Sequence, residues 1–76
     1  MKALIEFLAK SLVAHPEAVR VEEHSSERGL VLELTVAKED LGRVIGREGK
    51  TIKAIRNLLA AAAAKTKAKV ALVIQE

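Results

Sequence analysis

The sequence predicts an α+β fold in which a three-stranded mixed sheet carries three helices on one face. Two observations lead to this prediction. Segments with alternating apolar and polar residues, typical of half-buried strands, are separated by segments whose apolar residues recur every three or four positions, as in helices. The segments follow one another in the order α-β-β-α-α-β, with a glycine turn between the last two helices. Seventy-six residues, half of them hydrophobic and 30% charged, suit one domain with one core.

The N-terminal segment, residues 2–14, has the spacing of an amphipathic helix. Its apolar face combines four residues that recur three or four positions apart: Leu4, Ile5, Leu8 and Leu12. Pro16 ends the helix, because proline lacks a backbone N–H and biases the residue before it away from helical angles. Phe7, the only aromatic residue, lies on the flank of this face, and we expect it to pack in the core, with contact to a partner as the alternative.

Two alternating segments follow and predict a β-hairpin. In the first, Val19 and Val21 alternate with charged residues, and the polar run HSSERG at residues 24–29 supplies the turn. The second has one apolar face and one mixed face: Leu30, Leu32, Leu34 and Val36 alternate with Val31, Glu33 and Thr35. We expect the helices to bury the apolar face and the mixed face to meet solvent or a partner.

The second half of the chain predicts two helices and a last strand. Asp40 is expected to be the N-cap of a short helix that ends at Gly46. From about Lys50, a long helix carries apolar residues at helical spacing: Ile52, Ile55, Leu58, Leu59 and Ala62. Apolar residues then alternate along a strand at residues 70–74. Because a helical crossover joins the last two strands, they should be parallel.

Composition excludes several classes of protein. The chain has no cysteine, which rules out disulfides and thiolate metal sites. His15 and His24 lie nine residues apart with no acid clustered about them, so we expect no metal and no cofactor. No nucleophile and base converge, and we expect no enzyme. Glu6 and Lys10 interrupt the apolar N-terminus, and the longest apolar run, Leu58–Ala64, has only seven residues. We therefore expect a soluble, cytoplasmic protein with no signal peptide and no membrane span.

The net charge of +3 is distributed unevenly. Residues 1–40 carry five Lys or Arg and eight Asp or Glu, a balance of −3. Residues 41–69 carry eight basic residues against Glu48 alone, a balance of +7: Arg43, Arg47, Lys50, Lys53, Arg56, Lys65, Lys67 and Lys69. This basic half favours a polyanionic partner, since a merely solvated helix face usually mixes both signs.

The stretch GREGKT at residues 46–51 allows two interpretations. Its ending matches the tail of a P-loop, but a P-loop needs a glycine five positions before Gly49, where this chain has Val44. A P-loop also follows a strand directly, so we do not expect nucleotide hydrolysis. The other interpretation is a backbone clamp, because glycines three apart let the main chain approach a sugar-phosphate backbone at a helix N-terminus. By itself this spacing also fits a plain connection between two helices.

The wider context favours the clamp. The run GRVIGREGKTIKAIRNLL at residues 42–59, between two strands, resembles the core of a KH domain, whose GxxG loop joins two helices and holds about four nucleotides. A helix and a strand ahead of the core strand are similar to the type II arrangement of bacterial proteins. The chain as a whole resembles the small single-KH-domain RNA-binding proteins of the KhpA family. This implies one KH domain over residues 1–76, with an N-terminal extension at 1–27 and a core at 28–76.

The resemblance also implies the binding residues, which would line a narrow groove between the helices and the sheet edge. The clamp would consist of the loop itself: Gly46, Arg47, Glu48 and Gly49. The basic positions beside it are Arg43, Lys50, Lys53 and Arg56. Three apolar positions either line the groove or anchor the helices: Val44, Ile45 and Ile52.

The predicted function is non-catalytic binding of a short single-stranded RNA, as in an RNA chaperone or a post-transcriptional regulator. RNA rather than DNA follows from the resemblance, and KH grooves in general also hold single-stranded DNA. Glu48 inside the turn and the lack of an aromatic stacking platform predict modest affinity. A second site would come from a homodimer or from a heterodimer with a larger KH-containing protein. The alternative is a protein-interaction module with weak or lost nucleic-acid binding.

Overall fold

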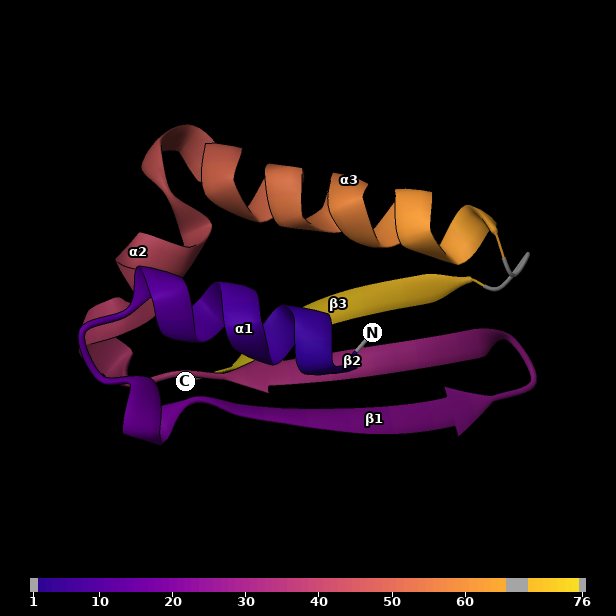
Figure 1. Cartoon of the computed structure of the whole chain (residues 1–76), viewed down its shortest axis with the longest axis horizontal. Helices are drawn as coiled ribbons and strands as arrows, with labels where there is room; N and C mark the ends of the chain where they lie inside the picture. Colours follow the sequence, from indigo (N-terminus) through magenta and orange to yellow (C-terminus); the bar gives the residue numbers. More distant parts are fainter. Residues whose placement is uncertain (1, 66–68, 76) are drawn as a thin grey trace.

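The computed structural model describes residues 2–65 and 69–75, so that Lys67, one of the basic residues counted above, lies outside the described residues. Helices and strands follow in the expected order (Figure 1): α1 (Lys2–Leu12), β1 (Arg20–Ser26), β2 (Gly29–Thr35), α2 (Leu41–Ile45), α3 (Lys50–Ala64) and β3 (Val70–Gln75). Short 3₁₀ segments precede β1, α2 and α3: Pro16–Ala18, Lys38–Asp40 and Arg47–Gly49.

The sheet has the order β1-β2-β3, with β2 in the middle. β2 pairs antiparallel with β1, where Leu34 lies opposite Val21, and parallel with β3, where Leu32 lies opposite Leu72. A helical crossover with α2 and α3 makes the parallel pairing possible, since parallel neighbours cannot be joined by a tight turn. The α+β fold class predicted from the sequence is confirmed.

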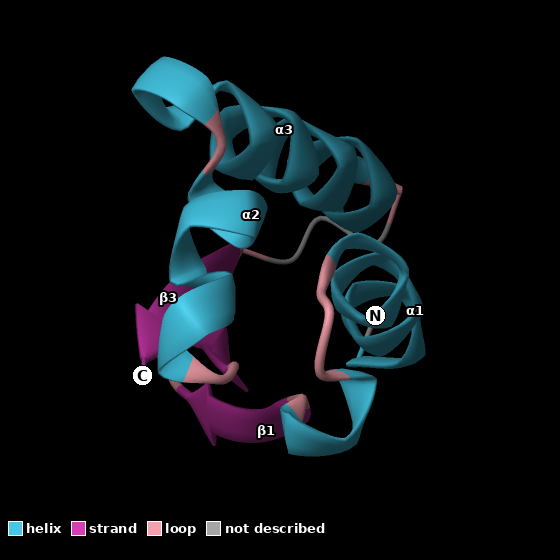
Figure 2. Ribbon diagram, turned by 90° about the vertical axis from the view of Figure 1, so that its left-hand side faces the viewer, coloured by secondary structure: helices cyan, strands magenta, loops and turns pink. Residues whose placement is uncertain are grey.

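All three helices lie on one face of the sheet, with α1 and α3 next to each other (Figures 1 and 2). The core between the two layers contains side chains from every helix and strand: Ile5, Ala9, Val21, Leu32, Leu34, Val44, Ile52, Ile55, Leu59 and Leu72. On the open face, Val31, Glu33 and Thr35 are half-buried and Ala71 and Val73 are exposed. The predicted division of β2 into a core face and an open face is therefore confirmed.

The expectation that Phe7 packs in the core is wrong. Its side chain is 68% exposed, whereas Ile5 and Ala9 are each 1% exposed. Successive residues of a helix are about 100° apart, so Phe7 lies about 200° around α1 from both Ile5 and Ala9 and faces away from the sheet. Of the predicted face of α1, Ile5 is buried and Leu8 is partly buried against the core, whereas Leu4 and Leu12 are exposed. Ala9, which was not predicted, completes the buried strip.

The apolar residues at helical spacing in α3 are not all buried. Leu58 is 51% exposed, because the buried strip of α3 runs through Ile52, Ile55, Leu59 and Ala63. Helix α1 ends at Leu12 rather than at residue 14.

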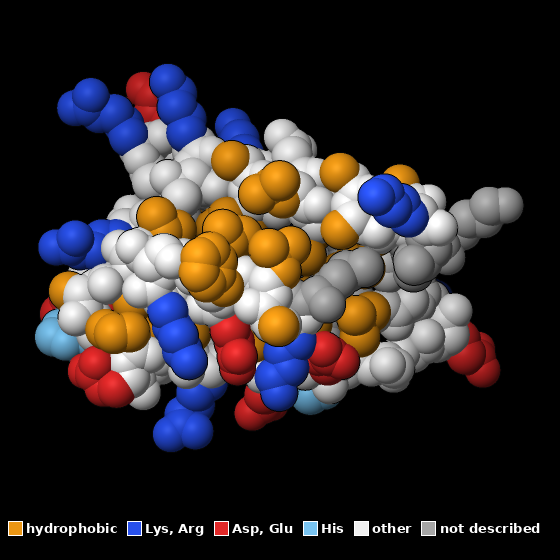
Figure 3. Space-filling model, viewed as in Figure 1, with side chains coloured by type: hydrophobic (Ala, Val, Ile, Leu, Met, Phe, Trp, Pro, Cys, Tyr) orange, Lys and Arg blue, Asp and Glu red, His pale blue; other side chains and the backbone are white. Residues whose placement is uncertain are grey.

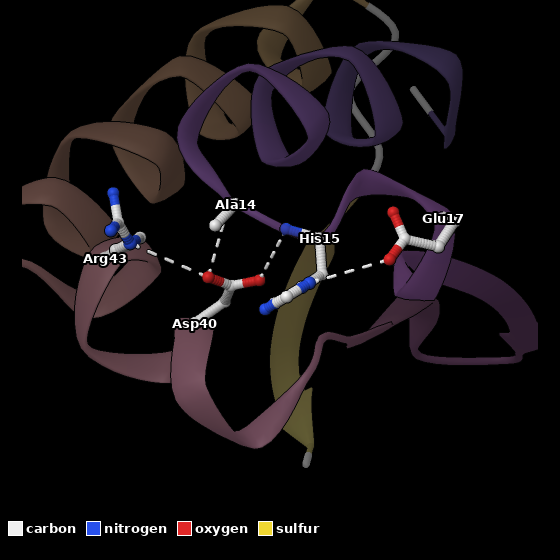
Figure 4. A network of polar contacts seen from close by, with 5 residues as sticks. All are labelled: Ala14, His15, Glu17, Asp40 and Arg43. Atoms are coloured by element: carbon white, nitrogen blue, oxygen red, sulfur yellow. Dashed lines mark hydrogen bonds and ion pairs between the residues drawn. The ribbon is translucent and has the colours of Figure 1, made fainter.

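Asp40 was expected to cap α2, but its carboxylate makes no hydrogen bond to that helix. Its Oδ1 accepts the backbone N–H of Ala14 at 3.1 Å, and its Oδ2 accepts the N–H of His15 at 3.0 Å (Figure 4). Arg43 Nε lies 3.6 Å from Oδ1. Two N–H groups left over beyond the end of α1 thus find their acceptor on the segment that begins α2, and Asp40 ties the N-terminal helix to the core.

Burial shifts the pKa of Asp40 in one direction and its partners shift it in the other. Asp40 is 1% exposed, and this desolvation by itself raises the pKa of the carboxyl. The N–H donors of Ala14 and His15, together with the charges of His15 and Arg43, outweigh that cost. The pKa of Asp40 is therefore held below its ordinary value, and the residue is ionised in the native protein.

Candidate nucleic-acid interface

A tight turn of four residues joins α2 to α3. The N–H of Gly46 donates to the carbonyl of Gly42 at 2.9 Å and closes α2. The N–H of Gly49 then donates to the carbonyl of Gly46 at 3.1 Å, which forms the 3₁₀ turn from which α3 starts. The turn therefore lies immediately before the positive N-terminal end of a 15-residue helix.

The two glycines of this turn are required for different reasons. Gly46 has φ 78° and ψ 169°, and a Cβ atom there would lie 2.6 Å from Thr51 Cβ and 2.8 Å from Thr51 N. Gly49 has φ 73° in the left-handed region, but a Cβ atom there would meet only Ile52 Cγ2, at 3.9 Å. Close packing and backbone angle both demand glycine at the first position, whereas only the angle does at the second.

Glu48 lies between these glycines and is itself in the left-handed region, with φ 56° and ψ 24°. It is the only non-glycine residue with positive φ in the part of the chain that the structure describes. This conformation costs an L-residue roughly 1–2 kcal/mol. The middle of the turn therefore carries both a backbone strain and a negative charge.

Three of the predicted basic residues are exposed to solvent around this turn. Arg47, Lys50 and Lys53 are exposed, and none of them forms an ion pair with any described residue. Lys and Arg side chains project from the upper left end of the molecule in Figure 3, where the turn and the start of α3 lie. Arg43 differs from these three, because its guanidinium is paired with buried Asp40.

The structure separates the two roles that the sequence left open for the apolar positions. Val44 is fully buried and Ile52 is 6% exposed, so both side chains anchor their helices in the core. Ile45, at the end of α2, is 39% exposed and is available to a ligand. Of the three predicted apolar site residues, only Ile45 thus has the surface needed to line a binding groove.

Arg56 occupies a position that the sequence did not suggest. It lies two helical turns beyond Gly49 on α3, and its Nη2 donates a hydrogen bond to the backbone carbonyl of Leu72 on β3 at 3.3 Å. Arg56 therefore connects the helix that starts at the glycine turn with the outer strand of the sheet. No signal in the sequence could have indicated this contact, because its acceptor is a main-chain atom.

The expectation that His24 has no acid near it is also wrong. His24 Nε2 lies 3.4 Å from Glu33 Oε1 and 3.6 Å from Glu22 Oε2. The antiparallel register brings these residues together on the open face of the sheet, where Glu22 lies opposite Glu33. The three side chains are partly or largely exposed, and their ligand atoms lie within 4.8 Å of one another. This cluster is on the sheet face that no helix covers, away from the glycine turn.

Comparison with known proteins identifies the family of this chain. The family model of the KhpA/KhpB KH domain matches residues 2–74. The chain is a member of this family. It is 49% identical over 72 residues to the RNA-binding protein KhpA of Halalkalibacterium halodurans, which covers 95% of each chain. It is 46% identical over 76 residues to that of Chlamydia caviae, covering 100% of this chain and 97% of the relative.

A third relative, the RNA-binding protein KhpA of Clostridium perfringens, is 51% identical over 70 residues, covering 92% of this chain and 93% of its own. No solved structure matches the chain. Membership in the KhpA/KhpB family confirms the KH-domain resemblance read from the sequence and the prediction that the chain is not an enzyme. Among the described residues, no helix combines the length and the apolar character needed to cross a membrane.

Proposed function

We propose that this KhpA/KhpB family member is a cytoplasmic, non-catalytic RNA-binding protein that holds a short single-stranded segment at the turn Gly46–Gly49. One observation carries the proposal: a turn bounded by two half-buried, positive-φ glycines lies beside three exposed basic side chains that have no ion-pair partner among the described residues. The relatives bear the name of an RNA-binding protein, which agrees with this reading.

The turn supplies the chemistry that a sugar-phosphate chain requires. Gly49 has no side chain to obstruct a phosphate, whereas the space beside Gly46 is filled by Thr51. The N-terminal end of α3 favours negative charge at the same place. Arg47, Lys50 and Lys53 extend the positive surface from the turn along α3. For three phosphate contacts on a single strand, the logarithm of the binding constant should fall with the logarithm of salt concentration with a slope of about −2.

This mode of binding is weak for a single domain, which suits an RNA chaperone or a post-transcriptional regulator that engages and releases many strands. Glu48 opposes phosphate at the centre of the turn. The only aromatic ring, Phe7, lies on α1, so base stacking on an aromatic side chain does not contribute at the turn.

A double substitution tests the proposal. Arg47→Asp with Glu48→Asp places two acids in the turn, and binding of a fluorescein-labelled single-stranded RNA, followed by fluorescence anisotropy, should be abolished. The matched control is Lys38→Asp with Glu39→Asp, which makes the same change of charge on two exposed residues in the 3₁₀ segment before α2. Circular dichroism should be unchanged in both variants. Unaltered RNA binding by the Arg47/Glu48 variant would falsify the assignment of the clamp.

A second function is favoured by a separate observation. Leu4, Phe7 and Leu58 are all exposed, and together they define what we call the α1–α3 apolar surface. Figure 3 shows hydrophobic side chains gathered over these two helices on the face toward the viewer. In Figure 2, α1 lies across the molecule from β3, so the apolar surface and the outer strand occupy different sides. We propose that this surface pairs the chain with a second copy or with a larger KH-containing protein.

Such pairing is compatible with RNA binding and would bring two weak sites together. Light scattering across a concentration series, with and without RNA, distinguishes the two functions. A dimer that forms without RNA and persists when RNA is added supports an assembly role for the apolar surface. A monomer at every concentration contradicts pairing with a second copy.

A further inference from the structure

The open face of the sheet carries three metal-ligating side chains that the proposed RNA site does not use. Glu22 and His24 lie two residues apart on β1, so their side chains project to the same face. Glu33 lies opposite Glu22 on β2 and projects to this face as well. All three helices lie on the other face (Figures 1 and 2). The pairing of β1 with β2 therefore assembles three ligands on a surface that no described helix covers.

The two carboxylates lack a permanent counter-charge. Like charges directly opposite each other on paired strands destabilise a sheet. Among the described residues, Glu22 and Glu33 form no ion pair with any Lys or Arg. Arg20, which the register places on the same face opposite Thr35, pairs with neither of them. Their only ion-pair partner in this part of the chain is His24, which carries a charge only when it is protonated. A bound cation would remove the repulsion between the two glutamates.

The spacing of the ligand atoms matches a tetrahedral zinc site. Zn²⁺ binds imidazole nitrogen and carboxylate oxygen at about 2.0–2.2 Å, so that two of its ligand atoms lie about 3.3–3.6 Å apart. His24 Nε2 lies 3.4 Å from Glu33 Oε1 and 3.6 Å from Glu22 Oε2. All three ligand atoms lie within 4.8 Å of one another. The side chain of Glu22 is 68% exposed, and a small rotation of it is enough to close the remaining gap.

We propose that Glu22, His24 and Glu33 form a Zn²⁺ site, in which one imidazole nitrogen and two carboxylate oxygens bind the ion and a water completes the tetrahedron on the solvent side. An imidazole ligand favours Zn²⁺ over Mg²⁺ and Ca²⁺, which prefer oxygen ligands in greater number. Because the ligands come from both β1 and β2, only the native hairpin assembles the site, and the ion stabilises the folded state. The site does not depend on RNA binding at the glycine turn.

The test uses the full chain without an affinity tag, since added histidines would bind the same metal. Isothermal titration calorimetry with zinc chloride at neutral pH should show saturable binding of one ion per chain. Thermal denaturation followed by circular dichroism should show a higher Tm in excess Zn²⁺. Magnesium chloride at the same concentration should leave the Tm unchanged, and an equal rise with both metals overturns the assignment to zinc. Absence of saturable binding by the wild type overturns the site itself.

Three variants each remove one ligand: Glu22→Gln, His24→Gln and Glu33→Gln. Each should weaken Zn²⁺ binding by at least about tenfold, because loss of even an outer-shell partner of a metal ligand typically costs that much. Glu23→Gln is the matched control for charge, since Glu23 is exposed on β1 and projects to the opposite face from Glu22. His15→Gln removes the other histidine of the chain. Both controls should bind Zn²⁺ as tightly as the wild type.

The controls distinguish a defined site from general attraction of the ion to acidic residues. Zinc affinity that is unchanged in His24→Gln overturns the inference, as does equal weakening in Glu23→Gln and Glu22→Gln. The substituted side chains are partly or largely exposed, so the circular dichroism of the metal-free variants should match that of the wild type. Because the titration of the wild type is made first, the inference remains testable even if a variant does not fold.

Discussion

Gly46 and Thr51 are packed so closely that a Cβ atom on the glycine would lie 2.8 Å from the backbone nitrogen of Thr51. This contact joins the first residue of the turn to the first turn of α3. A Cβ atom at Gly49 would make only an ordinary contact with Ile52 Cγ2, at 3.9 Å, and one at Gly42 would have no heavy atom within 4 Å. Adding a methyl group to each of these three glycines, which lie within eight residues, should therefore affect the structure differently.

Gly46→Ala should distort the turn. The added Cβ clashes with backbone, and alanine resists φ 78°, so we expect a loss of about 1–3 kcal/mol in the free energy of unfolding. RNA affinity should fall with it. Gly42→Ala, in the regular helical conformation of α2, should raise stability by about 0.5–1 kcal/mol and leave RNA binding unchanged. Urea denaturation and anisotropy measure both effects, and equal stability of the two variants would contradict the packing argument.

Glu48→Gly should make the protein both more stable and a better RNA binder. Glycine accepts φ 56° without the cost of about 1–2 kcal/mol that glutamate bears, and the substitution removes a negative charge from the phosphate path. Glu48→Gln separates the two effects, because it removes the charge and keeps the strained side chain. We expect Glu48→Gln to improve binding with stability close to that of the wild type. Weaker RNA binding by both variants would show that the carboxylate helps to hold the ligand.

Phe7→Ala should change assembly and not folding. With 68% of its surface exposed, Phe7 contributes little to the core, and the free energy of unfolding of the monomer should change by less than about 0.5 kcal/mol. Sedimentation equilibrium should show weaker association. Ile5→Ala, two residues away and 1% exposed, is the matched control and should lose about 2–5 kcal/mol. If Phe7→Ala associated as strongly as the wild type, the α1–α3 apolar surface would not be the interface.

Asp40→Asn should lower stability in a pH-dependent manner. Burial by itself raises the pKa of the Asp40 carboxyl. The N–H groups of Ala14 and His15 and the charges of His15 and Arg43 have the larger effect, so that the pKa lies below 3.8. A depressed native pKa means that the carboxylate contributes stability above about pH 3.8, which is lost as the pH falls through the native pKa. The difference in Tm between wild type and Asp40→Asn should therefore be full near neutral pH and shrink in acid. If the difference in Tm between wild type and Asp40→Asn stayed the same from neutral pH to below pH 3.8, the charge of Asp40 would have no role in stability.

Much of the fold was readable in the sequence, because it depends on local patterns. Alternation in Leu30–Val36 specifies a strand with one buried face, and the spacing of Ile52, Ile55 and Leu59 specifies a helix with one buried strip. The order of these elements, with a helical crossover between the last two strands, then permits few topologies. The two glycines of the turn were also recognisable, since their spacing between helices is a local signal.

The remaining features depend on which residues the packing brings together. The spacing of its apolar residues shows that α1 has an apolar side. Only the orientation of the helix on the sheet determines that Ile5 and Ala9 are buried and that Phe7 is exposed. Asp40 is 26 residues from Ala14 along the chain, so its choice of partner over its own helix is invisible to any local rule.

The same reason separates the two parts of the proposed interface. Gly46, Gly49 and the basic residues after them are contiguous in the chain, and their local pattern was enough to predict a site for a polyanion. The bond from Arg56 to Leu72 spans 16 residues and ends on a backbone carbonyl whose direction is set by the pairing of β3 with β2. Because a main-chain acceptor has no residue type, only the folded arrangement of helix and strand edge could reveal it.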